Sequence, residues 1–291
     1  MLERILGIIV PVLLIIALGY VYAKKAKPDM LWVNRINMSV LSPALIFTAL
    51  ASKEFDIAAN SMLILASASV VLGSGLVAWP FARLLREDAR TLVPTIMFNN
   101  CGNLGLPLAV LAFGQVGFSA MVALFTISNL IHFTLGVWIV DHHARFGNLL
   151  KNPMVIATIA GFAFAIFHPP MPDALMLAIK IVGDAMVPLV LISLGVRLAD
   201  VAWSSWRLGV IGGLIRPLTG IAVAALLSLV LDLTPLQQSL LFLFGSLPPA
   251  VLNFMVAEQF NQEPGKVASI VLIGNALALV FVPIGLMLAL R

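Results

Sequence analysis

The sequence is poor in charged residues, in cysteine and in recognisable catalytic motifs. Lys, Arg, Asp and Glu make up 10% of its 291 residues, against about 25% in soluble domains, which excludes an ordinary soluble protein. Its single cysteine, Cys101, rules out an intramolecular disulfide. It contains no H-E-x-x-H or G-x-G-D motif and no nucleotide-binding glycine loop, which argues against an intramembrane protease and an ATP-driven pump. We therefore predict no enzymatic activity, no cofactor and no metal site.

Long apolar runs fill nearly the whole chain instead. Hydrophobic residues make up 61% of the sequence, and its mean hydropathy is +1.08. A helix needs about 20 consecutive, largely apolar residues to span a bilayer. The runs and the polar breaks between them predict an all-α membrane protein with ten transmembrane helices. The expected spans are 5–23, 32–50, 60–80, 91–113, 117–140, 153–168, 173–196, 208–231, 235–260 and 266–290.

Lysine and arginine are distributed unevenly between the two sets of connecting loops. The loops that follow odd-numbered spans carry 12 of the 17 basic residues, namely Lys24, Lys25, Lys27, Arg35, Arg83, Arg86, Arg90, Arg145, Lys151, Arg197, Arg207 and Lys266. The opposite side carries Arg4, Lys53 and Arg291. Because positively charged loops stay in the cytoplasm, we expect both termini to lie outside. The pI of about 9.5 follows from these loops and indicates no nucleic-acid partner.

Prolines and asparagines inside the apolar runs recur about half a chain apart. The matched pairs are Pro43 and Pro188, Pro107 and Pro249, and Asn129 and Asn275, which are separated by 145, 142 and 146 positions. This spacing predicts two five-helix repeats, residues 1–145 and 146–291. Because five is an odd number, the second repeat must cross the membrane in the opposite sense, which gives an inverted-topology repeat.

Two matched spans contain helix-breaking residues near their centres. The fourth span contains NNCGNLGLP and the ninth contains GSLPPAVLN. Pro107 and Pro249 cannot donate a backbone hydrogen bond and clash with the carbonyl four residues earlier. Irregular backbone at this depth is tolerated only where it is buried in protein or lines a wet cavity. We therefore expect the fourth and ninth helices to be broken, with a ligand site where the two breaks meet.

The motifs in these spans resemble one known family. The segments INMSVLSPALIF (36–47), MFNNCGNLGLPL (97–108) and GDAMVPLVLISLGVRL (183–198) are similar to the auxin efflux carrier family, which holds plant auxin carriers and bacterial permeases for malonate, malate and related carboxylates. The resemblance covers essentially the full length. The short connection at 141–152 departs from the plant members, which have a long cytoplasmic loop there, and favours the bacterial permeases.

The resemblance implies the fold of the bile-acid sodium symporters. In that fold helices 1, 2, 6 and 7 (about 5–50 and 153–196) form a scaffold. Helices 3–5 and 8–10 (about 60–140 and 208–290) form a transport domain that moves like an elevator, with helices 4 and 9 broken and crossing.

The function implied is secondary active transport across the bacterial inner membrane. The expected substrate is a small organic anion, a mono- or dicarboxylate such as malonate or malate, with proton or sodium coupling. We also expect a homodimer formed through the scaffold. The alternative is a sodium-coupled symporter for organic anions or bile acids, and a channel or sensor is a weaker third hypothesis.

Polar and helix-breaking residues inside the spans are candidates for substrate binding, because half-helix N-termini carry partial positive charge and suit a carboxylate. The candidates are Asn99, Asn100, Asn103, Gly105, Pro107, Asn129, Arg216, Pro248, Pro249, Asn253 and Asn275. Each kind of residue has an alternative role. The asparagines at the breaks can mend the opened helix, and those of the fifth and tenth spans can join helices. Arg216 can snorkel to the cytoplasmic surface instead of clamping a carboxylate.

Two acidic residues are candidates for ion coupling. Glu258 lies at the inner end of the ninth span and is the only acidic residue near a break. Asp184 follows Lys180 by four positions in the seventh span, a spacing that favours a structural ion pair over a coupling role. His132 lies one turn after Asn129, and we expect it to be a packing histidine.

Overall fold

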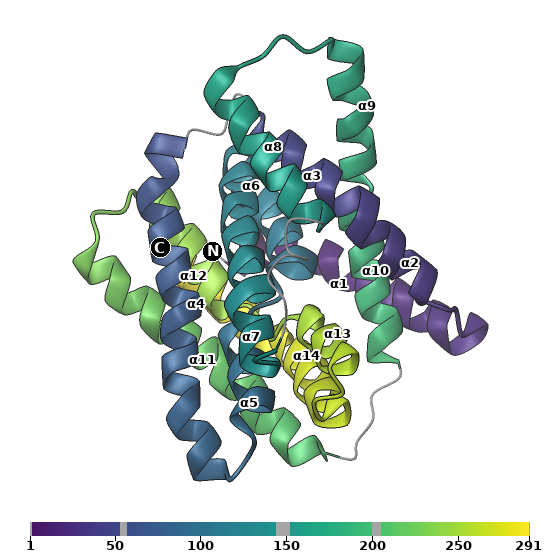
Figure 1. Cartoon of the computed structure of the whole chain (residues 1–291), viewed down its shortest axis with the longest axis vertical. Helices are drawn as coiled ribbons and strands as arrows, with labels where there is room; N and C mark the ends of the chain where they lie inside the picture. The colour runs from purple at the N-terminus through teal and green to yellow at the C-terminus, as the bar shows by residue number, and fades with distance from the viewer. Residues whose placement is uncertain (1, 53–56, 144–151, 200–204, 291) are drawn as a thin grey trace.

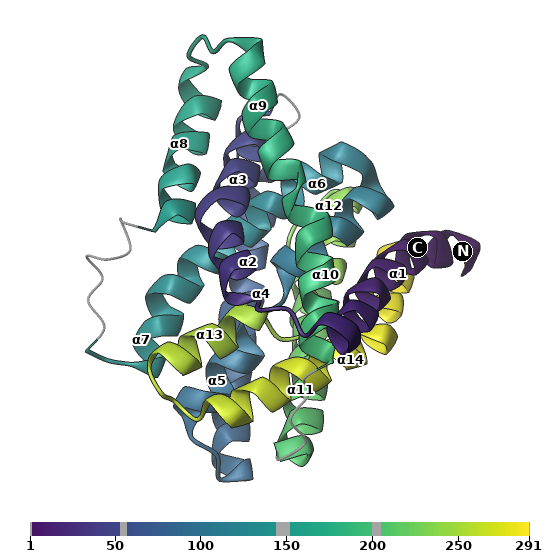
Figure 2. The ribbon, with the colours of Figure 1, turned by 90° about the vertical axis from the view of Figure 1, so that its right-hand side faces the viewer.

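The computed structural model describes residues 2–52, 57–143, 152–199 and 205–290. Within these ranges all regular secondary structure is helical and there is no β-strand (Figures 1 and 2). The predicted all-helical fold is thus confirmed. The expected repeat boundary at 145/146 lies outside the described residues, as do Lys53, Arg145, Lys151 and Arg291.

The described elements are α-helices and three π-helical segments, labelled η1 to η3. The N-terminal half contains α1 (Leu2–Ala26), α2 (Leu31–Ile36), η1 (Asn37–Leu41), α3 (Ser42–Leu50), α4 (Ile57–Leu85), α5 (Ala89–Met97), η2 (Cys101–Gly105), α6 (Leu106–Ile131), η3 (His132–Gly136) and α7 (Val137–Val140). The C-terminal half contains α8 (Pro153–Phe167), α9 (Asp173–Asp184), α10 (Met186–Leu198), α11 (Trp206–Val230), α12 (Pro235–Ser246), α13 (Val251–Gln259) and α14 (Pro264–Ala289).

Seven helical stretches among the described residues are long and apolar enough to cross a membrane. They are Glu3–Ala26, Trp32–Leu50, Ala58–Leu85, Cys101–Val140, Asp173–Leu198, Trp206–Val230 and Pro264–Ala289, and α8 is a shorter apolar helix. The stretch from Cys101 to Val140 contains a sharp bend at Gly114, whose φ of 67° and ψ of −161° are non-helical. A positive φ suits glycine, which has no Cβ to clash. This bend falls between the expected spans 91–113 and 117–140, while the ten-helix inverted repeat itself stays a prediction.

Short polar signals begin several of the helices. The side chain of Asp88 accepts the backbone N–H of Arg90 at 2.8 Å at the start of α5. Thr234 and Gln237 form a reciprocal capping box at the start of α12. Such caps satisfy N–H groups that a helix start leaves unpaired.

The helices pack in two main sets of neighbours. Helix α1 packs along α10, and α3 packs against α8 and α9, whereas α11 packs against α14, α12 and α4. Glycine permits the closest approach of α1 and α10. A Cβ on Gly195 would collide with the carbonyl oxygen of Ile16, and a Cβ on Gly19 would collide with that of Ile192. Small residues at such contacts are typical of membrane helix pairs.

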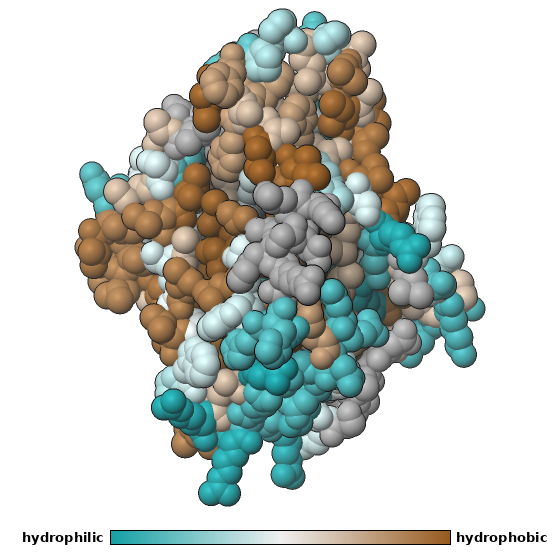
Figure 3. All heavy atoms as spheres, viewed as in Figure 1, coloured by the Kyte–Doolittle hydropathy of each residue, from teal (hydrophilic) through white to brown (hydrophobic). Residues whose placement is uncertain are grey.

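The outer surface is apolar over most of the molecule. Hydrophilic side chains gather at the lower end of the view in Figure 3, and hydrophobic ones cover much of the rest of that face. Large side chains that face outward include Leu76, Leu84, Phe167 and Leu229, which are 74–86% exposed. Apolar exposure on this scale identifies a surface that faces lipid rather than water.

Candidate functional site

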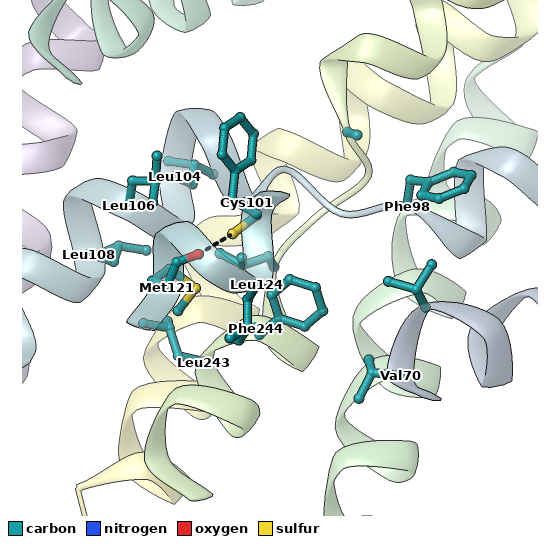
Figure 4. Packing of buried hydrophobic residues seen from close by; sticks show 14 of the residues in the cluster. Val70, Phe98, Cys101, Leu104, Leu106, Leu108, Met121, Leu124, Leu243 and Phe244 are labelled. Atoms are coloured by element: carbon teal, nitrogen blue, oxygen red, sulfur yellow. Dashed lines mark hydrogen bonds between the residues drawn. The ribbon is translucent and has the colours of Figure 1, made fainter. Parts of the chain in front are cut away.

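The two interrupted helices pair with each other where their backbones are extended. Asn100 donates its backbone N–H to the carbonyl of Pro248 at 2.7 Å, and Ala250 donates to the carbonyl of Phe98 at 3.0 Å. These bonds form an isolated antiparallel bridge between two crossing segments, one of which runs from Phe98 to Cys101 in Figure 4. An unpaired backbone group in a bilayer costs several kcal/mol. Each break therefore supplies partners that the other one lacks.

Asparagine side chains tie the crossing to its surroundings. The Asn99 amide donates to the carbonyl of Phe244 at 2.6 Å. The Asn100 amide donates to Oδ1 of Asn275 at 2.6 Å, and Asn275 in turn donates to the carbonyl of Pro249 at 3.0 Å. Asn275 thus joins α14 to the crossing, in keeping with its alternative role, and the Asn99 amide satisfies a carbonyl in the last turn of α12.

Some buried amide atoms at the crossing have no partner among the described residues. These are Oδ1 of Asn99 and both amide atoms of Asn253, whose residues are 5% and 3% exposed. Leaving such a group unpaired costs about 1–3 kcal/mol. The crossing therefore keeps hydrogen-bonding capacity beyond what its own fold uses.

A small cavity opens directly beside the crossing. We call it the crossover cavity; its volume is about 90 Å³. Its polar lining consists of Asn34, Asn37, Ser42, Asn99, Asn100, Asn103, Asn129, Ser193 and Arg197. Its apolar lining includes Phe125 and four methionines, Met38, Met154, Met186 and Met255. The cavity therefore presents amide and hydroxyl groups and one cation against an adaptable apolar wall.

A larger space adjoins the crossover cavity. This vestibule has a volume of about 880 Å³, and its charged lining residues are Asp29, Arg35, Arg197 and Glu258. The two spaces share the lining residues Asn34, Met38, Arg197, Val251 and Met255. A solute in the vestibule thus has the crossover cavity as its neighbour.

The structure brings only some of the predicted site residues to these spaces. Asn99, Asn100, Asn103 and Asn129 line the crossover cavity, and Glu258 lines the vestibule. The others do not line either space and instead lie at or behind the crossing; they are Gly105, Pro107, Arg216, Pro248, Pro249, Asn253 and Asn275. Asp184 is 2.7 Å from Lys180, so the expected ion pair between them is present, in an exposed position.

The expectation that Pro107 itself breaks the fourth helix needs correction. The complete break lies earlier, between Met97 and Cys101, and Pro107 is in the first turn of α6. The π-helical segment η2 ends two residues before Pro107, as η1 ends two residues before Pro43. A proline removes one α-helical hydrogen bond and crowds the preceding turn. We attribute the wider π-helical turns to that effect.

The structure rules out snorkelling to the membrane surface, one of the two roles that the sequence left open for Arg216. Arg216 is 0% exposed and donates from Nη1 to the carbonyl of Gly245 at 3.5 Å. Its Nε and Nη2 have no partner among the described residues. It is held inside because α11 and α12 approach closely, with Gly220 facing Gly245 one turn beyond Arg216. His132 is also buried and stacks on Phe98 with ring centroids 3.9 Å apart, which fits a packing histidine.

Sequence reasoning missed several residues of the crossover cavity. Asn34 and Asn37 lie in the second span, and amides inside an apolar run are a signal that could have identified them. Asn37 also begins η1, and π-helical turns are frequent at functional sites. Ser193 and Arg197 lie on α10. In the sequence, Arg197 is simply one of the basic residues that indicate a cytoplasmic loop.

A second polar cluster lies away from both spaces, at the loops before α5 and before α14. Thr91 donates to Glu263 at 2.6 Å, and Lys266 lies 2.7 Å from both Glu263 and Glu87. Gln262 donates to Thr91 at 3.0 Å. Desolvation raises the pKa of the Glu263 carboxyl, but the hydrogen bonds from Lys266 and Thr91 outweigh it and hold that pKa below its ordinary value. The cluster ties the two interrupted regions together at one end.

Comparison with known proteins points to transporters rather than enzymes. Residues 4–146 and 146–286 match the family described as membrane transport protein. A Rhizobium meliloti (strain 1021) protein provisionally named a malonate transporter is 25% identical over 304 residues, covering 94% of this chain and 92% of that protein. An uncharacterized transporter of Methanothermobacter thermautotrophicus is 26% identical, with 95% of each chain covered.

The plant relatives match over a shorter stretch. Auxin efflux carrier component 3a of Oryza sativa subsp. japonica is 26% identical over 138 residues, which is 45% of this chain and 22% of that protein. The family match itself extends over nearly the whole sequence. The chain therefore belongs to the membrane transport protein family, the group that includes the auxin efflux carriers.

Proposed function

We propose that this chain is a secondary active carrier for a small organic anion, a mono- or dicarboxylate such as malonate or malate. The observation that carries the proposal is the chemistry of the crossover cavity. Six asparagines, two serines and one arginine line it, and no described Asp or Glu does. Amide N–H groups, hydroxyls and a guanidinium all donate hydrogen bonds to a carboxylate. The relative provisionally named a malonate transporter supports the same substrate class.

The proposed mechanism is an elevator-like movement of one set of helices against the other. The scaffold would comprise α1, α2, α3, α8, α9 and α10, and the transport domain would comprise the remaining helices, arranged as two inverted repeats. Residues of both groups line the crossover cavity, for example Ser193 of the scaffold and Asn103 of the transport domain. A substrate bound there would leave the scaffold wall when the transport domain moves, because the fourth-span break belongs to that domain.

The position of the vestibule indicates the side of the membrane from which a substrate would reach the crossover cavity. Its lining includes Asp29 from the connection after α1, Arg35 from the short helix α2, and Glu258 from the end of α13. These connections belong to the basic set that the charge distribution places in the cytoplasm. We therefore propose an inner-membrane orientation with both termini outside, captured open to the cytoplasm. Glu258 is the coupling candidate that borders the path, whereas Asp184 is paired elsewhere.

Substitutions at Asn103 test the proposed function. Asn103 lines the crossover cavity, is partly exposed to it, and lies in η2. Asn103→Asp keeps the size but replaces the amide donors with a carboxylate that repels an anion, and Asn103→Leu removes all hydrogen bonding. We expect both variants to lose uptake of labelled malonate in proteoliposomes. The aspartate variant should recover partly as the pH falls, because its carboxyl becomes protonated.

The matched control is Asn261→Asp, which makes the same change at an exposed loop residue. It should transport at the wild-type rate. If Asn103→Asp and Asn103→Leu also transport at that rate, at equal amounts of reconstituted protein, the cavity is not the substrate site and the proposal fails.

A further inference from the structure

Arg197 occupies a distinctive position between the two spaces. It is the one Lys or Arg among the described residues that line the crossover cavity. It lies in the last turn of α10, is partly buried, and also lines the vestibule. Asn99, Asn100 and Asn103 line only the inner space. An anion that moves from the vestibule to these asparagines therefore passes the guanidinium.

The guanidinium of Arg197 is available for a ligand. Within the described part of the chain it makes no hydrogen bond and no ion pair. Glu258 borders the same vestibule and attracts it electrostatically without forming an ion pair. A guanidinium presents its donors in a planar fork that fits both oxygens of a carboxylate. Its position and its free donors together suit it to binding a carboxylate.

One face of α10 forms the wall that leads from Arg197 inward. Met186, Val190, Ser193 and Arg197 all line the crossover cavity, and their spacing of four, three and four positions places them on one side of a helix. At 1.5 Å per residue this wall is about 16 Å long, and the four residues from Ser193 to Arg197 account for about 6 Å of it. The charge thus lies at the outer end, and the inner end is apolar. A ligand that contacts both Arg197 and the asparagines needs polar groups at two ends.

We propose that Arg197 binds one carboxylate of a dicarboxylate whose other carboxylate lies among the asparagine amides of the fourth-span break. This inference rests on the proposed function and deepens it, because it selects a dicarboxylate over a monocarboxylate. Uncharged amides can hydrogen-bond a neutral carboxamide as well as a carboxylate. A guanidinium favours the ionised group. Discrimination by charge therefore depends on Arg197.

The test compares malonate with malonamide, in which carboxamides of similar size replace both carboxylates, so that neither end offers a charge to Arg197. Binding to the purified full chain is measured by isothermal titration calorimetry in detergent. We expect the wild type to bind malonate about 10–150-fold more tightly than malonamide, the range for a hydrogen-bonded charged group. Arg197→Gln should weaken malonate binding by that factor and leave malonamide binding nearly unchanged. Arg197→Lys should be intermediate, because it keeps the charge but loses the fork.

The matched control is Arg35→Gln, which removes the same charge from an exposed residue that lines the vestibule alone. It should keep the wild-type ratio of the two affinities. Melting temperature without ligand and gel-filtration profile show whether each variant is folded. If Arg197→Gln does not fold, Arg197→Lys decides: a reduced ratio supports the inference and a wild-type ratio overturns it.

The remaining outcomes separate the inference from the proposed function. If the wild type binds malonate but Arg197→Gln keeps the full ratio, or weakens both ligands equally, the assignment of Arg197 is wrong while the carrier proposal stands. If Arg35→Gln lowers the ratio as much as Arg197→Gln, only the overall charge of the vestibule matters, and the assignment is again wrong. If the wild type binds neither compound, the proposed substrate class fails, and the inference fails with it.

Discussion

Replacing Gly19 by alanine tests the close packing of α1 on α10 without touching either cavity. An added Cβ at Gly19 would collide with the carbonyl oxygen of Ile192 and would lie 2.9 Å from its carbonyl carbon and its Cα. These are backbone atoms, so relief requires the two helices to move apart. Forcing an extra methyl group into a packed site typically costs about 1–3 kcal/mol. We expect Gly19→Ala to lower the free energy of unfolding by about this amount, reduced by the helix preference of alanine.

Gly7→Ala is the matched control because Gly7 lies on the same helix and has nothing within 4 Å of an added Cβ. Alanine is favoured over glycine by roughly 0.5–1 kcal/mol at both positions, so this preference cancels when the two variants are compared. The remaining difference is the packing cost, which corresponds to about a 5–150-fold change in the unfolding equilibrium constant. Gly7→Ala alone should be neutral or slightly stabilising.

The assay is equilibrium unfolding in mixed micelles, followed by circular dichroism. Gly195→Ala provides a second measurement from the other helix, since its Cβ would collide with the carbonyl oxygen of Ile16. Equal unfolding midpoints for Gly19→Ala and Gly7→Ala would refute the reasoning, because they would show that α1 and α10 do not approach this closely.

Two further predictions concern orientation and pH. In a Cys101→Ser background, a cysteine at exposed Arg86 should be protected from an impermeant thiol reagent in intact cells and one at exposed Asp173 should react; the reverse labelling would invert the proposed topology. Because the pKa of Glu263 is depressed in the folded protein, its contribution to stability is present at neutral pH and is lost as the pH falls through that pKa. The stability difference between wild type and Glu263→Gln should therefore shrink as the pH falls below the ordinary glutamate pKa of about 4.3. A difference that grows in acid would contradict the role of Lys266 and Thr91 as hydrogen-bond donors to Glu263.

Hydropathy and helix-breaking residues predicted the helices and the regions of the two breaks because both signals are local. A segment that crosses lipid must be long and apolar, and it must pair its own backbone groups by forming a helix. Both requirements apply to each segment by itself, so they can be recognised in its own sequence. The exact break was harder to locate. Pro107 is the strongest breaker by residue type, yet the chain opens at Phe98–Asn100. The helix opens at these residues because the backbone of Pro248 and Ala250 lies beside them and pairs with them. Such pairing between distant segments leaves no signal in the local sequence.

The candidate site was predicted only on its asparagine-rich side. Asn99, Asn100 and Asn103 stand out because amides are rare in an apolar run, and they do line the crossover cavity. Arg197 could not be recognised in the same way, because an arginine at the end of a span is what the positive-inside rule predicts for any loop. The sequence left the role of Arg216 open for a related reason. Whether an arginine side chain reaches the membrane surface depends on the neighbouring helices, so the sequence of one helix does not predict a fully buried position.

The mutual pairing of the two breaks has a consequence for how the protein is made. The backbone N–H of Asn100 and the carbonyl of Phe98 pair with Pro248 and Ala250, which leave the ribosome about 150 residues later. At about 5–20 residues per second, this interval is roughly 8–30 s. During that time the Asn100 N–H and the Phe98 carbonyl lack these partners. Unpaired backbone groups are stable in a bilayer only beside water or another protein, so we expect a hydrated or chaperoned intermediate until the second half arrives.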